Sequence, residues 1–84
     1  MENNSIVIIF NWHEKRLMID VEIPLDITAN DLIIGLNEGF KLGMDVNDLS
    51  KCHLKTENPV ALLKGNKTLK EYRLHNATII HYIR

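Results

Sequence analysis

The chain has 84 residues, of which 45% are hydrophobic and 25% are charged, and its formal net charge is −1. This length accommodates one domain and leaves no room for a second core. Ten basic side chains stand against eleven acidic ones, so the charge balance gives no reason to expect a nucleic acid or an anionic membrane as the partner.

The start of the chain and its single cysteine predict the compartment. Residues 1–5 lack the basic and apolar regions of a secretion signal, and the longest apolar run, residues 6–10, is far shorter than the ~20 residues that cross a bilayer. Cys52 has no second cysteine with which to form an internal disulfide, which fits a reducing environment. We therefore expect a cytoplasmic protein without direct membrane insertion, in which residues 1–5 are frayed and residues 6–84 form the domain.

Two strands joined by a short turn are predicted first. Residues 6–12 are rich in β-branched and aromatic side chains, which favour a strand. The polar segment 13–16 suits a hairpin loop, and residues 17–23 then alternate between apolar and mostly polar side chains, as expected for a second strand. Pro24 should end this strand, because proline cannot donate a backbone hydrogen bond.

A change of period after the hairpin predicts a helix. Thr28 is a suitable N-cap, and Asp31 follows at a position where an acidic group favours the helix N-terminus. An apolar stripe follows, made of Leu32, Ile33, Leu36 and Phe40. Gly35 and Gly39 weaken a helix, and their place near the stripe predicts close packing against a sheet. Gly43 is the expected C-terminal cap.

The second half of the sequence predicts shorter strands. Residues 44–50 form a linker, residues 52–56 can pair with residues 60–63, and residues 78–84 form the terminal strand. The order is ββαββ. One helix packed on a mixed sheet of four to five strands, with the last strand beside the first, makes an α+β fold of the β-grasp type.

The C-terminal part carries a specific resemblance. Residues 68–74 read Thr-Leu-Lys-Glu-Tyr-Arg-Leu, and residues 80–84 read Ile-His-Tyr-Ile-Arg. Together they resemble the closing segment of ubiquitin, which shares the phrase Thr-Leu-x-x-Tyr-x-aliphatic. By this resemblance, Leu69 plugs the open end of the sheet and the Tyr72 hydroxyl ties a loop to the backbone.

A narrower resemblance covers residues 6–84. It rests on Ile6-x-Ile8-x-Phe10-x-Trp12, on Ile23-Pro24-x-x-Ile27-x-x-Asp31-Leu32-Ile33, on Leu62-Leu63, on Leu69-x-x-Tyr72-x-Leu74 and on Ile79-Ile80-His81-Tyr82-Ile83. These positions resemble the YukD/EsaB-like family of bacterial ubiquitin-like proteins associated with type VII secretion. The resemblance implies an accessory adaptor whose partners are the cytosolic parts of secretion-machine proteins. The alternative is a free-standing ubiquitin-like scaffold or regulator unrelated to secretion.

Conjugated ubiquitin-like proteins and sulfur carriers resemble one another in ending with a flexible Gly-Gly tail. The final nineteen residues of this sequence contain no glycine. We therefore expect a protein that is neither adenylated nor conjugated, and that acts by binding.

Catalytic and metal sites are not predicted. Adjacent strand residues point to opposite faces, so His53 would not reach the thiol of Cys52, which we expect to be a buried structural residue. The carboxylates are scattered along polar faces. His13 and His75 fall in loops. His53 and His81 lie on neighbouring strands, but two imidazoles are fewer than the four ligands of a structural zinc site. We expect no enzyme activity, cofactor or metal.

A protein-binding face is predicted on the side of the sheet away from the helix, because residues between the inward positions of segment 6–12 must point outward. The predicted face consists of Val7, Ile9, Met18, His53, Lys55, His81 and Ile83. His81 and Ile83 resemble positions in the main docking surface of ubiquitin, whereas Lys55 stands where ubiquitin has an apolar residue. The expected occupant is another protein or a second copy in a homodimer, and Ile9→Asp should abolish binding without unfolding the domain. The alternative is that these side chains only support the strands.

Overall fold

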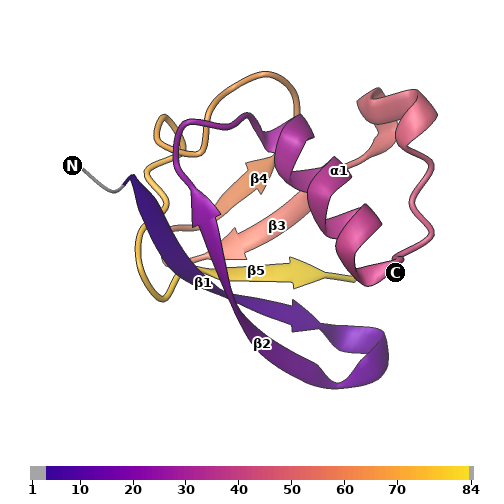
Figure 1. Cartoon of the computed structure of the whole chain (residues 1–84), viewed down its shortest axis with the longest axis horizontal. Helices are drawn as coiled ribbons and strands as arrows, with labels where there is room; N and C mark the ends of the chain where they lie inside the picture. The colour runs from indigo at the N-terminus through magenta and orange to yellow at the C-terminus, as the bar shows by residue number, and fades with distance from the viewer. Residues whose placement is uncertain (1–3, 84) are drawn as a thin grey trace.

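The computed structural model describes residues 4–83, in which one α-helix lies across one face of a single mixed sheet (Figure 1). The strands are β1 (Ser5–Trp12), β2 (Leu17–Pro24), β3 (Leu54–Glu57), β4 (Ala61–Leu63) and β5 (Ile79–Tyr82). Their order in the sheet is β2-β1-β5-β3-β4. The central strands β1 and β5 run parallel, and the other neighbours are antiparallel. The predicted β-grasp fold is confirmed, with three strands after the helix in the order ββαβββ.

The opening hairpin begins slightly earlier than expected. β1 already includes Ser5, which pairs with Pro24 of β2, and the Asn4 carbonyl accepts a hydrogen bond from the Leu25 N–H. The predicted frayed segment therefore does not extend to residues 4 and 5, and residues 1–3 lie outside the described part of the chain. A short 3-10 turn, η1 (His13–Lys15), joins the two strands.

The helix α1 (Ala29–Phe40) begins at the predicted cap. The Thr28 hydroxyl accepts a hydrogen bond from the Asp31 N–H, and the Asp31 carboxylate accepts one from the Thr28 N–H, which is a capping box. The predicted C-terminal cap is wrong, because Lys41 rather than Gly43 is the first left-handed residue after the helix. The earlier reversal places Leu42 in the core, where it is almost completely buried.

The reason predicted for the two helical glycines is also wrong. Gly35 and Gly39 are both exposed, and a Cβ added at either would meet no atom of the surrounding structure within 4 Å. The buried residues of the helix are Ala29, Leu32, Ile33 and Leu36. The glycines therefore face solvent and not the sheet.

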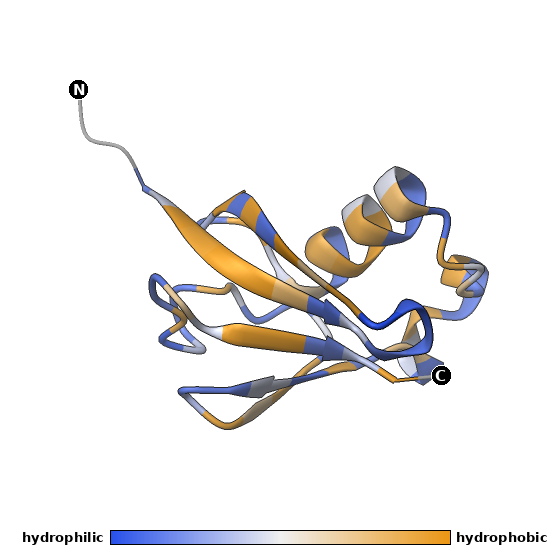
Figure 2. Ribbon diagram, turned by 90° about the horizontal axis from the view of Figure 1, so that it is seen from below, coloured by the Kyte–Doolittle hydropathy of each residue, from blue (hydrophilic) through white to orange (hydrophobic). Residues whose placement is uncertain are grey.

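The core fills the space between α1 and the inner face of the sheet. Figure 2 shows that the two central strands are largely hydrophobic, whereas polar residues gather in the connections. The most completely buried large side chains are Ile8, Phe10, Ile33, Leu54, Leu63, Leu69 and Ile80. The predicted linker contains a 3-10 segment, η2 (Val46–Lys51). None of the helices within residues 4–83 has the length and apolar character needed to cross a membrane.

The segment between β4 and β5 closes one end of this core. Leu69 is completely buried, and its N–H donates to the Ile27 carbonyl at 2.9 Å. The Tyr72 hydroxyl donates to the Lys64 carbonyl at 2.9 Å and accepts from the Lys64 N–H at 3.2 Å. Both roles expected for this segment, a plug and a tie to backbone, are confirmed.

Candidate functional site

A row of outward-facing side chains crosses all five strands on the side of the sheet away from α1. Asn11 of β1 lies opposite Met18 of β2 on one side and His81 of β5 on the other. His81 in turn lies opposite Lys55 of β3, which lies opposite Leu62 of β4. We call this side of the sheet the outer face. It is a continuous surface because the register of every strand pair keeps these positions aligned.

The outer face includes the seven predicted binding residues, but they differ in accessibility. Met18 and Ile83 are 61% and 62% exposed, and Val7, His53 and Lys55 are also exposed. Ile9 is less accessible than these five and is half-buried, because its neighbours on the adjacent strands are Asp20 of β2 and Ile79 of β5. His53, Lys55, His81 and Ile83 border one small hollow. Val7 and Ile9 are not among the residues that line it.

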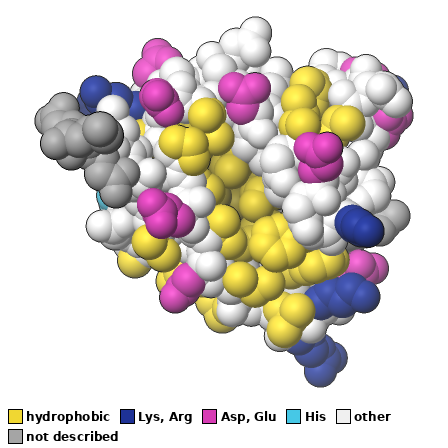
Figure 3. Space-filling view, viewed as in Figure 1, with side chains coloured by type: hydrophobic (Ala, Val, Ile, Leu, Met, Phe, Trp, Pro, Cys, Tyr) yellow, Lys and Arg dark blue, Asp and Glu magenta, His cyan; other side chains and the backbone are white. Residues whose placement is uncertain are grey.

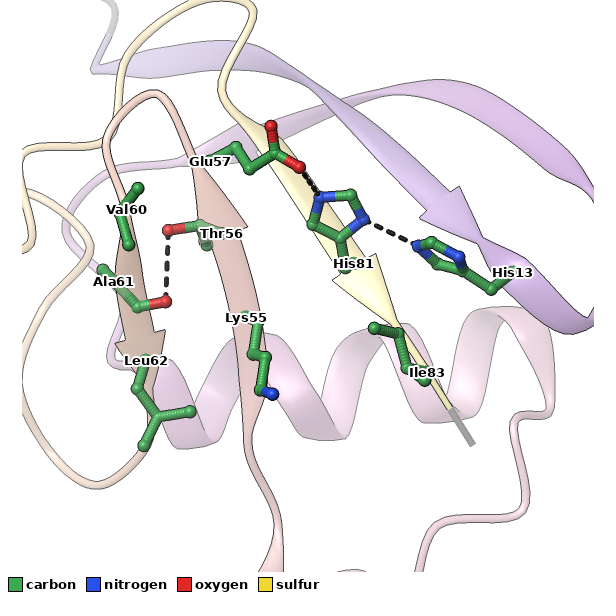
Figure 4. Close-up of a pocket in the computed structure, with 9 residues that line it drawn as sticks. All are labelled: His13, Lys55, Thr56, Glu57, Val60, Ala61, Leu62, His81 and Ile83. Atoms are coloured by element: carbon green, nitrogen blue, oxygen red, sulfur yellow. Dashed lines mark hydrogen bonds and ion pairs between the residues drawn. The ribbon is translucent and has the colours of Figure 1, made fainter.

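A larger hollow of about 580 Å³ lies beside this group, over β3, β4 and β5 (Figure 4). Its lining includes the exposed apolar side chains of Val60, Leu62 and Ile83, together with Lys55 and His81. Val60 and Leu62 are not among the residues of the predicted binding face. Leu62 could have been found, because it alternates with buried Leu63 in a strand paired with β3.

The wall of this hollow contains a chain of three polar side chains that the sequence did not predict. The His13 Nε2 lies 2.7 Å from the His81 Nδ1, and the His81 Nε2 lies 2.6 Å from a carboxylate oxygen of Glu57 (Figure 4). A carboxylate only accepts, so His81 donates from Nε2, and in a neutral ring its Nδ1 then accepts from His13. Glu57 and the loop residue His13 therefore converge on His81.

Hydrophobic and acidic side chains are prominent on the face of the molecule that Figure 3 shows. The view in Figure 3 shows a band of hydrophobic side chains with acidic groups spread around it, and no group of histidines is seen there.

Comparisons with known proteins identify the fold. No protein-family model matches the sequence, and no curated protein matches it. Among solved structures, the chain is similar to a ubiquitin-like domain from tubulin-binding cofactor B, with 15% identity and a TM-score of 0.74 over 95% of this chain and 89% of that one. The chain has a ubiquitin-like fold.

Two further ubiquitin-like domains show the same likeness. The domain of Plasmodium falciparum Dsk2 has 20% identity and a TM-score of 0.62, covering 92% of this chain and 96% of that one. The domain of yeast Ddi1 has 19% identity and a TM-score of 0.63, covering 95% and 91%. At these identities the likeness describes the fold alone.

The single cysteine of this ubiquitin-like domain is buried, as predicted. Its thiol donates to the Asp45 carbonyl at 3.4 Å. Burial, followed by the negative charges of Asp45 and Asp48, raises the pKa of the Cys52 thiol, so the reactive thiolate is disfavoured. His53 is exposed, so the expected separation of the two side chains is confirmed.

No conventional metal centre is present among residues 4–83, since no three histidine, cysteine or acidic side chains are arranged to hold an ion. The pair of histidines considered from the sequence, His53 and His81, is not the pair that meets. His81 contacts His13 instead, with ring centroids 4.9 Å apart.

Proposed function

We propose that this ubiquitin-like domain is a non-conjugated adaptor of a bacterial type VII secretion machine, and that it acts by binding other proteins through its outer face. Its partners would be cytosolic parts of the secretion proteins, and it would contact the membrane only through them. The resemblance of residues 6–84 to the YukD/EsaB-like family supports the choice of machine.

The observation that carries the binding role is the set of apolar side chains exposed around the larger hollow. Val60 is 88% exposed, and Leu62 and Ile83 lie on the same hollow. Removing apolar surface from water is favourable by roughly 25 cal/mol per Å², so a protein that covers this hollow gains free energy. Lys55 at its border has a charge that can select an acidic group on the partner.

The experiment is an affinity pull-down from native membranes and cytosol with the wild type, Ile83→Asp and Ile34→Asp. Ile83 is the better probe than Ile9, because Ile9 is half-buried and its replacement could disturb the sheet. Ile34 is a matched control, since it is an exposed isoleucine on α1, which covers the inner face. A thermal unfolding curve for each variant separates lost binding from lost folding.

The proposal predicts that the wild type and Ile34→Asp enrich secretion-machine proteins and that folded Ile83→Asp does not. Enrichment of unrelated proteins through the same face would favour the free-standing scaffold or regulator instead. Equal enrichment by all three proteins would refute the outer face as the binding surface. Sedimentation of the isolated domain tests whether a second copy occupies this face.

A further inference from the structure

We propose that His13 and His81 form a binding site for a divalent transition-metal ion of the class that prefers imidazole, such as Zn²⁺ or Cu²⁺. The site belongs to the isolated domain and does not depend on the proposed secretion function. The two ring nitrogens that would bind the ion, the His13 Nε2 and the His81 Nδ1, already face each other at 2.7 Å (Figure 4).

Metal binding requires the ring proton of His13 to move from one nitrogen to the other. In the hydrogen bond between the two rings, a neutral His13 carries its proton on Nε2. Histidine also exists with that proton on Nδ1, and His13 is exposed, so water can accept a hydrogen bond from the moved proton. This exchange leaves a lone pair on each facing nitrogen and removes no proton from the neutral pair.

Metal binding also requires the His13 Nε2 and the His81 Nδ1 to move slightly apart. Two imidazole ligands of one tetrahedral ion, each about 2.0–2.1 Å from it, are about 3.3 Å apart. The rings therefore have to separate by roughly 0.6 Å from their contact of 2.7 Å. His13 can make this movement, because it lies in the exposed turn η1 and contributes no buried side chain.

The His81 ring is already held in an orientation that suits a metal ligand. The side chain of His81 is only 14% exposed, and its Nε2 is held by the Glu57 carboxylate at 2.6 Å. Metal-binding histidines commonly donate their second ring N–H to a carboxylate, which fixes the tautomer and makes the ligand more basic. Glu57 is therefore a positioning residue for the His81 Nδ1, and not a ligand itself.

The coordination of the ion is incomplete within the described residues. The Asn11 amide lies 3.4 Å from the His81 Nδ1, and rotation of this amide would present its oxygen as a third, weaker ligand. No third histidine, cysteine or acidic side chain among residues 4–83 is placed to bind the same ion. The remaining positions are open to water, or to a ligand from a protein docked on the outer face.

The chain contains matched controls for this proposal. His53 lies on the same face and borders the same small hollow as His81, but the structure gives it no histidine partner. His75 lies in the segment before β5, and its Nδ1 contacts the Asn76 carbonyl at 2.8 Å. A nonspecific affinity of surface histidines for metal would depend on His53 and His75 as much as on the proposed pair.

The test is calorimetric titration of the domain with Zn²⁺, and separately with Cu²⁺, in a non-coordinating buffer above the ordinary histidine pKa of about 6.5. One ion should bind per chain. His13→Ala and His81→Ala should each weaken binding by at least about tenfold, and Glu57→Gln by about tenfold. His53→Ala and His75→Ala should leave the affinity unchanged. NMR of the imidazole nitrogens should show that the His13 Nε2 and the His81 Nδ1 respond to the ion.

The proposal is overturned if His53→Ala or His75→Ala weakens binding as much as His13→Ala, or if the wild type binds no more tightly than His13→Ala. It is also overturned if the loss of Glu57 has no effect on affinity. Because His13 is exposed in a turn, His13→Ala should keep its thermal transition, which preserves the test if His81→Ala unfolds. The transition of the wild type should rise on addition of metal, since an ion that binds only the folded state stabilises it.

Discussion

Leu69→Ala tests whether the segment between β4 and β5 is part of the core. Leu69 has no exposed surface, and its backbone is fixed by the hydrogen bond to Ile27. The surrounding structure therefore has little freedom to collapse into the space left by three missing carbon atoms. Buried leucine-to-alanine changes cost about 2–5 kcal/mol, and the fixed backbone places this one at about 3 kcal/mol or more. A chain of 84 residues has a total stability of only about 4–13 kcal/mol.

Urea unfolding followed by fluorescence measures this loss. Trp12 is the only tryptophan in the chain, and its ring packs against Phe10 and Phe40 with centroid distances of 6.3 and 6.0 Å, so its emission reports on the core. A loss of about 3 kcal/mol corresponds to a decrease of roughly 12–24 °C in the melting temperature of a domain of this size.

Leu62→Ala is the matched control, because Leu62 is an exposed leucine on β4. The same chemical change there should cost less than about 1 kcal/mol. If the two variants lost equal stability with equal denaturant dependence, Leu69 would not fill the core and the segment would not close the sheet.

Three further predictions follow from the contacts described above. Gly35→Ala and Gly39→Ala should each raise the free energy of unfolding by up to about 1 kcal/mol, because both sites are open to solvent; urea unfolding measures the gain. Burial raises the pKa of the Cys52 thiol, so stability should fall as pH rises from the ordinary thiol pKa of about 8.5 towards the raised one. This decline should be absent from Cys52→Ala. The Thr68 N–H and hydroxyl lower the pKa of Glu71, so its stabilising effect should be present above the ordinary glutamate range and be lost as pH falls through the lowered value. Thr68→Ala should raise the Glu71 midpoint in an NMR titration.

A specific outcome would contradict each of the predictions for the helical glycines, Cys52 and Glu71. Destabilisation by either glycine replacement would mean that the helix surface has a neighbour at that point. An alkaline decline of equal size in Cys52→Ala would assign the decline to other groups. An unchanged Glu71 midpoint in Thr68→Ala would remove the Thr68 hydroxyl as a cause of the lowered pKa and leave the residue 68 N–H as the cause.

The features that the sequence predicted correctly depend on neighbouring residues or on simple alternation. The Thr28 cap is decided by the four residues that begin the helix. The inward and outward sides of β1 follow from period two, which is why the outer face could be predicted before the strand order was known. The end of α1 was missed because Leu42 is drawn into the core, and this tertiary effect outweighs the usual preference for glycine at a cap.

The meeting of His13, Glu57 and His81 could not be predicted from local signals. His81 is 68 residues from His13 and 24 from Glu57, and the three come together only through the parallel pairing of β1 with β5 and the antiparallel pairing of β5 with β3. A shift of one residue in either register would turn His81 towards the core. Sequence alone identified the surface but not the groups that converge on it.

The position of β5 between β1 and β3 constrains when the chain can fold during its synthesis. During translation, the hairpin of β1 and β2, the helix and the β3–β4 pair all leave the ribosome before Ile79–Tyr82. Until then the sheet consists of two separate parts, and Phe10 and Leu54 of the unfinished core lack the strand that joins them. Cooperative folding should therefore begin only after β5 has emerged, and a nascent chain stalled before this point would expose unpaired strand edges to chaperones and proteases.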